Sequence, residues 1–568
     1  MMRLLHRTMA LGVACCAQLA THAQSDFNAK ALFSPMQKSF NEFGFRLAAA
    51  DLNADSFDDL VVSEPLAEVA GVTTAGRVWI FFGPDFAKSR EIRIGTPLQG
   101  EELGLGGLEA GDANDDGILD VLVLSPKADE SGVSDVGTAH LALGPEFNQA
   151  IELEFNAPHP GTQFGSAGAI LGNACSSADL LVGAPLVSRN MFSAAGEVAL
   201  YDVPSPDPVA IIATPAQDQG YFGSHIATAD MDDDGNSEVL VSAHFVSSPT
   251  GGQGVVYIMK PCGDIVEQVV LPPVIPGMPI SSFGRSVEVD ELAGGVGPDM
   301  LVGAPATNVG DLNDAGAFVL LEGPLFSNLV RTFVSPAASS DGAFGFWSAV
   351  ADFSHDGIAD IALGDPYAKP AALHAARVYV YLGPDYSDEM VVSDPLSSFV
   401  EFGEGVTAAD IDGDGYAELI CRSALADASG VVHVFDPVNL VPSLSSISLS
   451  QGGDISLQLG LGPKHAGKDY LIVLGVSGSD PGVVAGPGSY VRLNVDSITW
   501  AGLSLLRSAV LEDFIGTLDA QGSANAVIHW PPGLGKPLAG QTLTLAAVAI
   551  EQGRPDAGSS AASVSLTP

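Results

Sequence analysis

Five short acidic loops are the part of the sequence best suited to chemistry. They read "DLNADSFDD" from Asp51, "DANDDGILD" from Asp112, "DMDDDGNSE" from Asp230, "DFSHDGIAD" from Asp352 and "DIDGDGYAE" from Asp410. Together they hold 20 of the 68 Asp and Glu residues of the chain. Carboxylates packed this closely repel one another, so a bound cation is the natural counter-charge.

Oxygen-bearing side chains fall at positions 1, 3, 5 and 9 of every loop, and position 6 is glycine in four of the five. Alternate residues of a tight loop point toward one centre, and Ca²⁺ takes about six to eight oxygen ligands, including a backbone carbonyl such as that of position 7. Mg²⁺ demands a stricter octahedron with retained water, so we expect Ca²⁺ at about five sites. The predicted ligands are Asp51, Asn53, Asp55, Phe57 and Asp59; Asp112, Asn114, Asp116, Ile118 and Asp120; Asp230, Asp232, Asp234, Asn236 and Glu238; Asp352, Ser354, Asp356, Ile358 and Asp360; and Asp410, Asp412, Asp414, Tyr416 and Glu418.

The alternative is a set of acidic turns without metal, because Asp and Gly are common in turns for backbone reasons. Two equivalent stretches, "LGNACSSAD" and "DELAGGVGPD", lose the alternating oxygens but keep the flanking strand patterns. The hairpin therefore does not itself require the acids, and we expect these two loops to bind no metal. The extra acids Asp58, Asp115 and Asp233 are expected to face solvent.

An internal repeat places the loops. Phe-Gly pairs begin at Phe43, Phe164, Phe222, Phe283, Phe344 and Phe402, Leu103-Gly104 fills the missing place, and the spacing is 58 to 61 residues. Each unit continues with a tripeptide such as "GAP" and a strand such as "GRVWIFFGP". Small sheets of about four strands bury both faces only by stacking around an axis. We predict an all-β fold, a seven-bladed β-propeller over residues 28–437, with the Phe packed between blades; an open solenoid is the alternative.

The ends of the repeat region predict closure of the ring and a second domain. Lys30 to Ser34 resembles an outer blade strand although no blade precedes it, so we expect it to complete the last blade. Residues 438–568 contain alternating apolar stretches such as "DISLQLGL" and "TLTLAAVAI" separated by Gly and Pro turns. This pattern predicts a smaller β-sandwich-like domain.

Residues 1–23 read as a signal peptide. Arg3 and Arg7 precede a short apolar core, and small residues lead to a cleavage position near Ala23. A buried N-terminal helix is the alternative. No segment is long enough for a transmembrane helix, so we predict a secreted or cell-surface/periplasmic protein. Of the five cysteines, Cys175, Cys262 and Cys421 would remain after cleavage, and their spacing does not show whether any pair. The net charge of -45 argues against nucleic acid or an anionic membrane as partner.

The combination of Phe-Gly, acidic loop and Gly-Ala-Pro, repeated seven times, resembles the FG-GAP repeats of the integrin alpha-chain N-terminal propeller. The resemblance covers about residues 28–437. It implies a seven-bladed propeller, calcium in hairpin loops on one face, and an extracellular ligand-binding or adhesive role. The sequence departs from that family because no transmembrane helix and no inserted ligand-binding domain are visible, so an integrin heterodimer is not implied.

Catalytic motifs do not stand out. "GPKHAGKD" from Gly462 approaches a phosphate-binding loop, but Asp469 replaces the required Ser or Thr and strands flank it, so we interpret it as a turn. His225 is expected to be a packed strand residue. We predict a non-enzymatic, calcium-binding module for ligand binding or cell adhesion, with an extracellular protein or glycan as partner. The alternative is an exported carbohydrate- or lipid-active enzyme, a lyase or hydrolase, built on a calcium-stabilised propeller.

Overall fold

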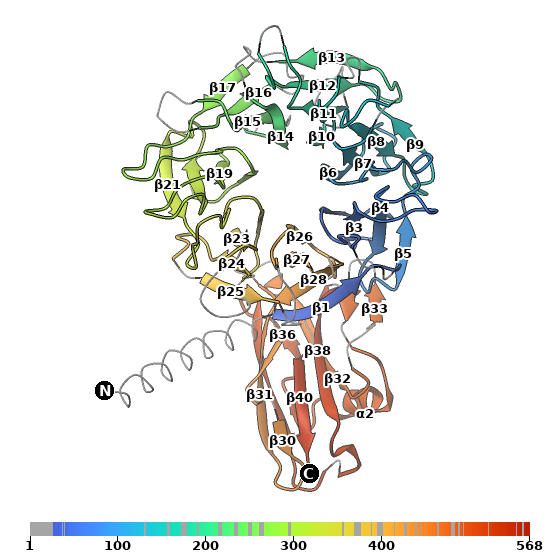
Figure 1. Ribbon diagram of the computed structural model, residues 1–568. Helices are drawn as coiled ribbons and strands as arrows, with labels where there is room; N and C mark the ends of the chain where they lie inside the picture. Colours follow the sequence, from blue (N-terminus) through green and yellow to red (C-terminus); the bar gives the residue numbers. More distant parts are fainter. Residues whose placement is uncertain are drawn as a thin grey trace, which may run out of the picture.

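The computed structural model shows a chain built almost entirely from β-strands, with a ring of sheets and a second body below the ring in the view of Figure 1. The structure describes residues 27–568 except 37, 39, 130–131, 156–158, 172–178, 190–191, 214–218, 232–236, 248–252, 261–265, 294–296, 355–356, 369–375, 388, 395–400, 414, 425–428, 438–439, 445, 463–464, 479–482, 487–488, 492, 521, 535, 552–553 and 559–561. The predicted signal peptide lies outside the described residues.

Within the described residues, seven four-stranded antiparallel sheets form the ring, which confirms the predicted seven-bladed propeller. Blades one to three contain β2 (Leu47–Ala50), β3 (Asp59–Glu64), β4 (Arg77–Phe82) and β5 (Lys88–Glu91); β6 (Gly107–Gly111), β7 (Asp120–Ser125), β8 (Thr138–Ala142) and β9 (Ala150–Glu152); and β10 (Gly168–Ile170), β11 (Leu180–Ala184), β12 (Glu197–Tyr201) and β13 (Pro208–Ile212). Blades four to six contain β14 (Phe222–Ala229), β15 (Glu238–Ala243), β16 (Val256–Met259) and β17 (Val266–Val270); β18 (Val287–Asp290), β19 (Asp299–Ala304), β20 (Ala317–Glu322) and β21 (Asn328–Phe333); and β22 (Ser348–Ala351), β23 (Asp360–Asp365), β24 (Arg377–Tyr381) and β25 (Glu389–Ser393). Blade seven contains β26 (Val406–Ala409), β27 (Glu418–Ala424), β28 (Gly430–Pro437) and β1 (Phe27–Phe33).

The first strand of each sheet faces the axis of the ring. These inner strands contact one another in sequence from β2 through β6, β10, β14, β18 and β22 to β26, and β26 contacts β2. They line a channel along the axis. The second strands, such as β3 and β7, are buried along their whole length because each is covered by blades on both sides. The described strands therefore close a ring and exclude the open solenoid.

The repeated aromatic residues pack between blades, as predicted. Phe43, for example, lies in one apolar cluster with Leu60 of blade one and Ile420 of blade seven, and Phe344 lies with Leu320 of blade five and Leu363 of blade six. Each of the seven residues at this repeat position is at most 7% exposed: Phe43, Leu103, Phe164, Phe222, Phe283, Phe344 and Phe402. We call these seven residues the wedge residues. Burying one Phe side chain contributes about 2 to 3 kcal/mol, so the seven interfaces hold much of the ring's stability.

The glycine after each wedge residue has a backbone reason. All seven have positive φ, from 78° at Gly104 to 127° at Gly345, which glycine adopts without steric cost. In six of the seven blades, a second glycine at the start of the third strand touches the wedge residue of the next blade, and blade six has Ala376 in its place. A Cβ on Gly316 would lie 1.8 Å from the carbonyl oxygen of Phe344, so only glycine lets the two backbones approach this closely.

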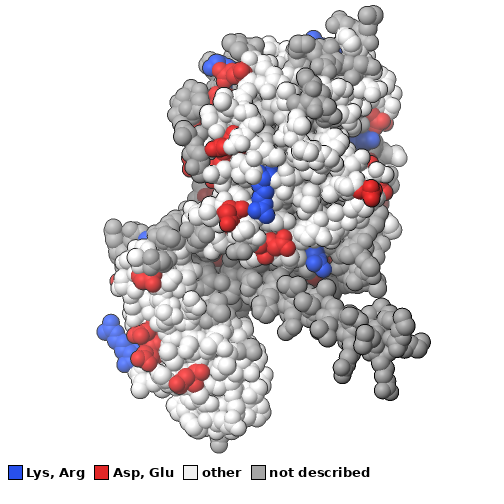
Figure 2. Space-filling model, turned by 90° about the vertical axis from the view of Figure 1, so that its left-hand side faces the viewer, with Lys and Arg blue, Asp and Glu red and all other residues white. Residues whose placement is uncertain are grey.

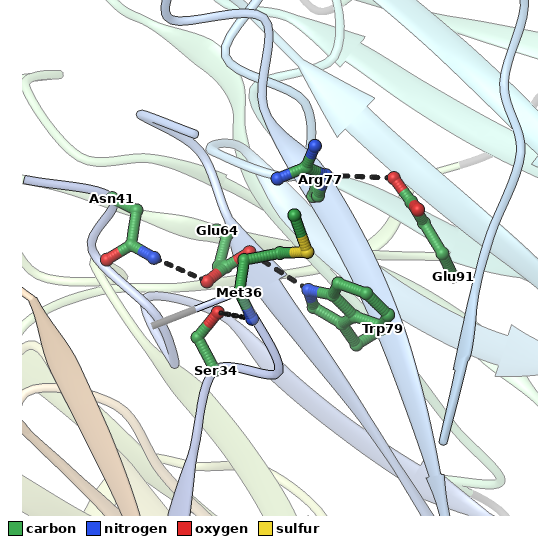
Figure 3. Close-up of polar contacts among 7 residues, drawn as sticks. All are labelled: Ser34, Met36, Asn41, Glu64, Arg77, Trp79 and Glu91. Carbon is green, nitrogen blue, oxygen red and sulfur yellow. Dashed lines mark hydrogen bonds and ion pairs between the residues drawn. The ribbon is translucent and has the colours of Figure 1, made fainter. Parts of the chain in front are cut away.

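The N-terminal strand closes the ring, as the sequence predicted. β1 pairs antiparallel with β28, from Phe27 opposite Pro437 to Phe33 opposite Val431. The chain then crosses to blade one, where the buried carboxylate of Glu64 accepts hydrogen bonds from two side chains (Figure 3). The amide of Asn41 donates to its Oε1 (2.6 Å), and the indole N–H of Trp79 donates to its Oε2 (2.9 Å). The crossing segment is therefore fixed by buried polar contacts as well as by the ladder.

Residues 440–567 form two further sheets packed face to face. One sheet contains β29 (Leu440–Pro442), β31 (Gly453–Gly460), β37 (Ser523–Trp530) and β35 (Leu511–Glu512). The other contains β30 (Ser446–Ser448), β40 (Ala562–Thr567), β38 (Thr542–Glu551), β32 (Asp469–Gly475), β36 (Ile515–Thr517) and β39 (Arg554–Gly558), while β33 (Val483–Gly486) pairs with β34 (Ser489–Val491). Leu457 and Ile528 of the first sheet share one core with Leu545 and Val564 of the second, which confirms the β-sandwich.

Two short helical elements in this part of the chain were not predicted. Helix α2 (Ser497–Leu505) is capped by Asp496, whose side chain accepts the backbone N–H groups of Ile498 and Thr499. The 3₁₀ helix η3 (Lys536–Leu538) is a single turn. The described residues of "GPKHAGKD" before Asp469, which are Gly462 and residues 465–468, lie between β31 and β32, and the strand β32, not a helix, follows them as expected.

Deleting residues 27–33 should destabilise the whole propeller cooperatively. The deletion removes the strand that pairs with β28, and with it the contact that closes the ring between the last blade and the first. Urea unfolding followed by tryptophan fluorescence and by far-ultraviolet circular dichroism should show one transition at lower urea for both probes. A deletion of residues 562–567 (β40) is the control, and it should affect the C-terminal sheets alone. If the β1 deletion melted only blade seven, closure would not be a global constraint.

Candidate functional site

The five acidic loops lie in equivalent places. Each connects the inner strand of its blade to the second strand: β2 to β3, β6 to β7, β14 to β15, β22 to β23 and β26 to β27. The inner strands run in the same direction along the axis, because their first residues line one end of the channel in every blade and their later residues line the next level. All five loops therefore lie at the same end of the ring, as expected from the repeat.

The first acid of each loop organises the loop backbone. In loop one, Oδ1 of Asp51 accepts the N–H of Asp55 (3.0 Å) and Oδ2 accepts the N–H of Ser56 (2.8 Å). The same bond joins position 6 to position 1 in three further loops, from Gly117 to Asp112, Gly357 to Asp352 and Gly415 to Asp410, at 2.8 to 2.9 Å. Position 6 has positive φ in all four, which is why glycine is preferred there and why Ser56 is the exception.

The last acid of loops one, two and four joins the loop to the end of the third strand of its blade. Oδ1 of Asp59 accepts the N–H of Gly83 (2.9 Å) at the end of the third strand, and Oδ2 accepts the N–H of Leu52 (3.1 Å). Gly144 donates in the same way to Asp120, and Gly383 to Asp360, both at 2.9 Å. Position 9 therefore has a structural role whether or not it binds a metal.

The two loops without alternating ligands keep this last acid, which the sequence reasoning missed. The N–H of Gly323 donates to Oδ1 of Asp299 (3.0 Å) and that of Leu292 to Oδ2 (2.9 Å). In blade three, Val203 donates to Oδ2 of Asp179 (2.7 Å). The signal was available, because an Asp or Glu stands directly at the start of the second strand in all seven repeats.

The carboxylates of one loop are close enough to disfavour their joint ionisation. Burial, followed by the charges of Asp55 and Asp51, raises the pKa of Asp59 to about 7, against the lowering effect of its backbone hydrogen bonds. Burial likewise raises the pKa of Asp120 and of Asp360 to about 6. A divalent cation would remove this repulsion, and a donor set made only of oxygen suits Ca²⁺. In their chemistry, the residues present fit a calcium ion.

The structure describes only part of the predicted ligand sets. Loops one and two are fully described, but Asp232, Asp234, Asn236, Asp356 and Asp414 lie outside the described residues. Across the described part of the chain, no three carboxylate, imidazole or thiol side chains converge closely enough to hold a metal ion. The ligand sets therefore remain a prediction.

Some acids near the loops have other roles. Asp58 was expected to face solvent, but its Oδ2 accepts the N–H of Asp410 (2.9 Å) and its own N–H donates to the carbonyl of Asp410 (3.0 Å). This pair joins loop one to loop five across the closure of the ring. In loop five, the ring of Tyr416 lies 6.0 Å from that of His465 in the C-terminal sheets, so this loop is also next to the second domain.

Other residues that the sequence singled out have these positions. His225 lies on strand β14 of blade four, in agreement with the expected strand position, and it lines the axial channel. Cys421 is a buried free thiol, while Cys175 and Cys262 lie outside the described residues. Among the described residues, no helix has the length and apolarity that crossing a bilayer requires.

In two of its blades, this ring of four-stranded sheets with Phe-Gly wedges and acidic hairpin loops is similar to the FG-GAP repeat. The profile of the FG-GAP repeat matches residues 43–81 and 402–435. The chain is similar to integrin alpha-PS5 of Drosophila melanogaster (28% identical over 246 residues, 41% of this chain and 23% of the relative). It is also similar to phosphatidylinositol-glycan-specific phospholipase D of Rattus norvegicus (27% over 248 residues, 43% and 23%) and to integrin alpha-7 of Homo sapiens (30% over 188 residues, 30% and 15%). The matched segments thus span less than a quarter of each of these relatives.

The substitution Asp299→Ala should destabilise the protein by about 3 kcal/mol even with EDTA present, because the N–H groups of Leu292, Ala293 and Gly323 lose a charged acceptor. Asp311→Ala, at an exposed position in the same blade, is the matched control and should leave stability unchanged. Urea unfolding in EDTA measures both. Equal stability of the two variants would show that the last acid of the loop has no structural role.

Proposed function

We propose that the protein is an exported, calcium-stabilised FG-GAP propeller that binds an extracellular ligand. The observation that carries the proposal is the FG-GAP architecture itself, shared in sequence with integrin alpha chains. Loops and strand ends at the two faces of a rigid ring offer surfaces on which binding residues can be placed without disturbing the blades. The ligand in this proposal is an extracellular protein or glycan.

In this proposal, calcium holds the acidic loops in their folded arrangement. The side chains at positions 1, 3, 5 and 9 and the backbone carbonyl at position 7 would hold each ion. With extracellular affinities of about 0.1 to 1 mM, each occupied site adds roughly 0.4 to 1.4 kcal/mol at about 1 mM calcium. Five such sites together match a large share of the net stability of a typical domain. The ion here supports the structure rather than catalysis.

An enzyme is the second candidate, because the relatives include phosphatidylinositol-glycan-specific phospholipase D from three organisms. The hypothesis that follows is an exported hydrolase acting on a glycan or on a glycosylated phospholipid. It requires turnover, whereas a binding module requires only retention of the ligand. The same assay can therefore separate the two functions.

Calcium should raise the melting temperature, and EDTA should reverse the increase, because the ions bind the folded loops alone. Asp116→Asn in loop two should lower the number of bound ions by one, measured by equilibrium dialysis with atomic absorption. Asp311→Asn, outside any candidate loop, is the control and should leave the number unchanged. Identical melting curves in calcium and in EDTA would refute the stabilising role.

An array of glycans and extracellular-matrix proteins, probed with calcium and with EDTA, tests the function itself. A binding module should be retained on a subset of spots in calcium and released by EDTA. Mass spectrometry of the spots, and of a glycosylphosphatidylinositol substrate in solution, would detect cleavage products. Products would favour the hydrolase, and absence of both retention and products would remove the proposed function.

A further inference from the structure

The axial channel contains a cavity at the end opposite the acidic loops. Its volume is about 390 Å³, within the range of small-molecule sites. It is lined by the residues that directly follow the wedge positions, from Phe45 in blade one to Glu404 in blade seven. A second hollow of about 320 Å³ shares Arg46, Ser166 and Arg285 with it. Each inner strand therefore begins at this cavity and leads away from it toward the acidic end.

Two arginines meet at this cavity without a carboxylate partner. Arg46 comes from blade one and Arg285 from blade five, and both line both hollows. Their guanidinium groups lie over aromatic rings, Arg46 at 5.2 Å from Phe45 and Arg285 at 5.0 Å from Phe346. Arg46 donates from Nε to the carbonyl of Leu105 (3.1 Å), and no described residue forms an ion pair with either arginine.

The arginines stay charged but repel each other. Burial, and after it the charge of Arg285, lowers the pKa of Arg46 to about 10, which still leaves it protonated at neutral pH. Two like charges that are partly withdrawn from water and lack a counter-ion cost free energy. An anion placed between two guanidinium groups would remove that cost and accept several charge-assisted hydrogen bonds.

Neutral polar groups complete the lining. His244 Nδ1 lies 2.6 Å from the hydroxyl oxygen of Ser224, and Nε2 of His225 is buried without a hydrogen-bond partner in the described part of the chain. Burial and the charge of Arg285 lower the pKa of His225 to about 4 and that of His244 to about 3, so both are neutral at pH 7. They can therefore exchange hydrogen bonds with hydroxyl groups of a ligand without adding charge.

The acids that line the cavity do not cancel the two arginines. Glu404 forms an ion pair with the buried Arg422 and accepts the hydroxyl of Tyr367 (2.9 Å). Glu109 lies farther along the channel, where burial and the charge of Glu288 raise its pKa to about 8, so it is largely protonated at neutral pH. The net charge of the described groups at the cavity is thus positive, in a chain whose formal charge is -45.

Outside the channel, charge is distributed differently. On the side shown in Figure 2, acidic and basic side chains of the described residues are scattered singly over a mostly uncharged surface. The described residues of this side thus offer no basic path for a long polyanion, and the strongly negative chain repels one beyond the immediate cavity. Because screening limits each charge to about 8 Å at physiological salt, a ligand with a single anionic group can still reach the arginines.

We propose that this axial cavity binds the acidic end residue of a glycan, a sugar ring that carries one carboxylate or sulfate group. The arginines Arg46 and Arg285 hold the anionic group, Ser224 and His225 of the cavity and His244 of the adjoining hollow meet ring hydroxyls, and Phe346 and Trp347 line the cavity beside the sugar ring. This inference rests on the proposed ligand-binding function and assigns its site to the end of the ring away from the calcium loops.

Titrations of the full chain with small probes test the site. Methyl glucuronide, a methyl glucoside sulfate, neutral methyl glucoside and a short peptide with one terminal glutamate are compared by calorimetry or saturation-transfer NMR. The sugars with a carboxylate or a sulfate should bind, and the neutral sugar should not. Whichever of the two acidic sugars binds more tightly identifies the preferred anionic group. Arg46→Gln and Arg285→Gln should each weaken binding about tenfold or more, since each removes a charged donor.

The matched control is Arg331→Gln. Arg331 also lies over an aromatic ring, Phe333 at 5.3 Å, but it sits on the outer strand β21 and donates to the carbonyl of Asp385. This variant should bind like the wild type. Melting curves of all variants show that the fold is kept, and Arg46→Lys, which retains the charge without the planar fork, should weaken binding less than Arg46→Gln.

Several outcomes would overturn the inference. Equal binding of neutral and acidic sugars would remove the anion site, and tighter binding of the glutamate peptide would assign the cavity to an acidic protein ligand instead. If the wild-type protein is retained on glycan spots and the Arg46 and Arg285 variants are retained equally well, the proposed function is supported and the cavity is not its binding site. If nothing is retained on the array, the function falls, while the sugar titration still decides whether the cavity binds an anion.

Discussion

A four-stranded sheet with two apolar faces is stable only when both faces are covered, and the whole architecture follows from this constraint. Each wedge residue fills the space between two such sheets, and the adjacent glycines let the backbones approach to the distance that this packing requires. No blade can be stable alone, since each supplies half of two interfaces. The ring must therefore be complete before any part of it, including the loops and the channel, has a defined geometry.

The loops show how one residue can serve both the fold and a ligand. The acid that ends each loop accepts backbone N–H groups in blades that have the full set of alternating oxygens and in blades that do not. In loop one, the acids at positions 1 and 5 accept N–H groups of their own loop. The acid that ends the loop is thus part of the structure that all blades share. The alternating oxygen side chains are an additional feature of five of the seven repeats.

The sequence predicted those features that depend on local pattern and period. Repeated spacing alone predicted the wedge positions and the seven blades. It also predicted that Lys30 to Ser34 would supply a strand to the last blade. The acid at the start of each second strand recurs with the same period, but the hydrogen-bond partner of Asp299 could not be read from it, because Gly323 lies 24 residues away, at the end of another strand. Likewise, Arg46 and Arg285 belong to different blades, and only the closed ring brings them to one cavity. The surroundings of a side chain, as for His225 in the channel and Asp58 beside Asp410, depend on neighbours that no local pattern reveals.

The pairing of β1 with β28 has a consequence for how the chain reaches its native state. The first described strand meets its partner only after every other blade has been synthesised, because Phe27 lies opposite Pro437. Contacts between such distant segments carry a large loop-closure entropy and slow the search for the native topology. Until then, the edges of β1 and β28 stay unpaired and open to other chains. A protein closed in this way therefore depends on holding its early strand soluble and out of wrong pairings throughout synthesis.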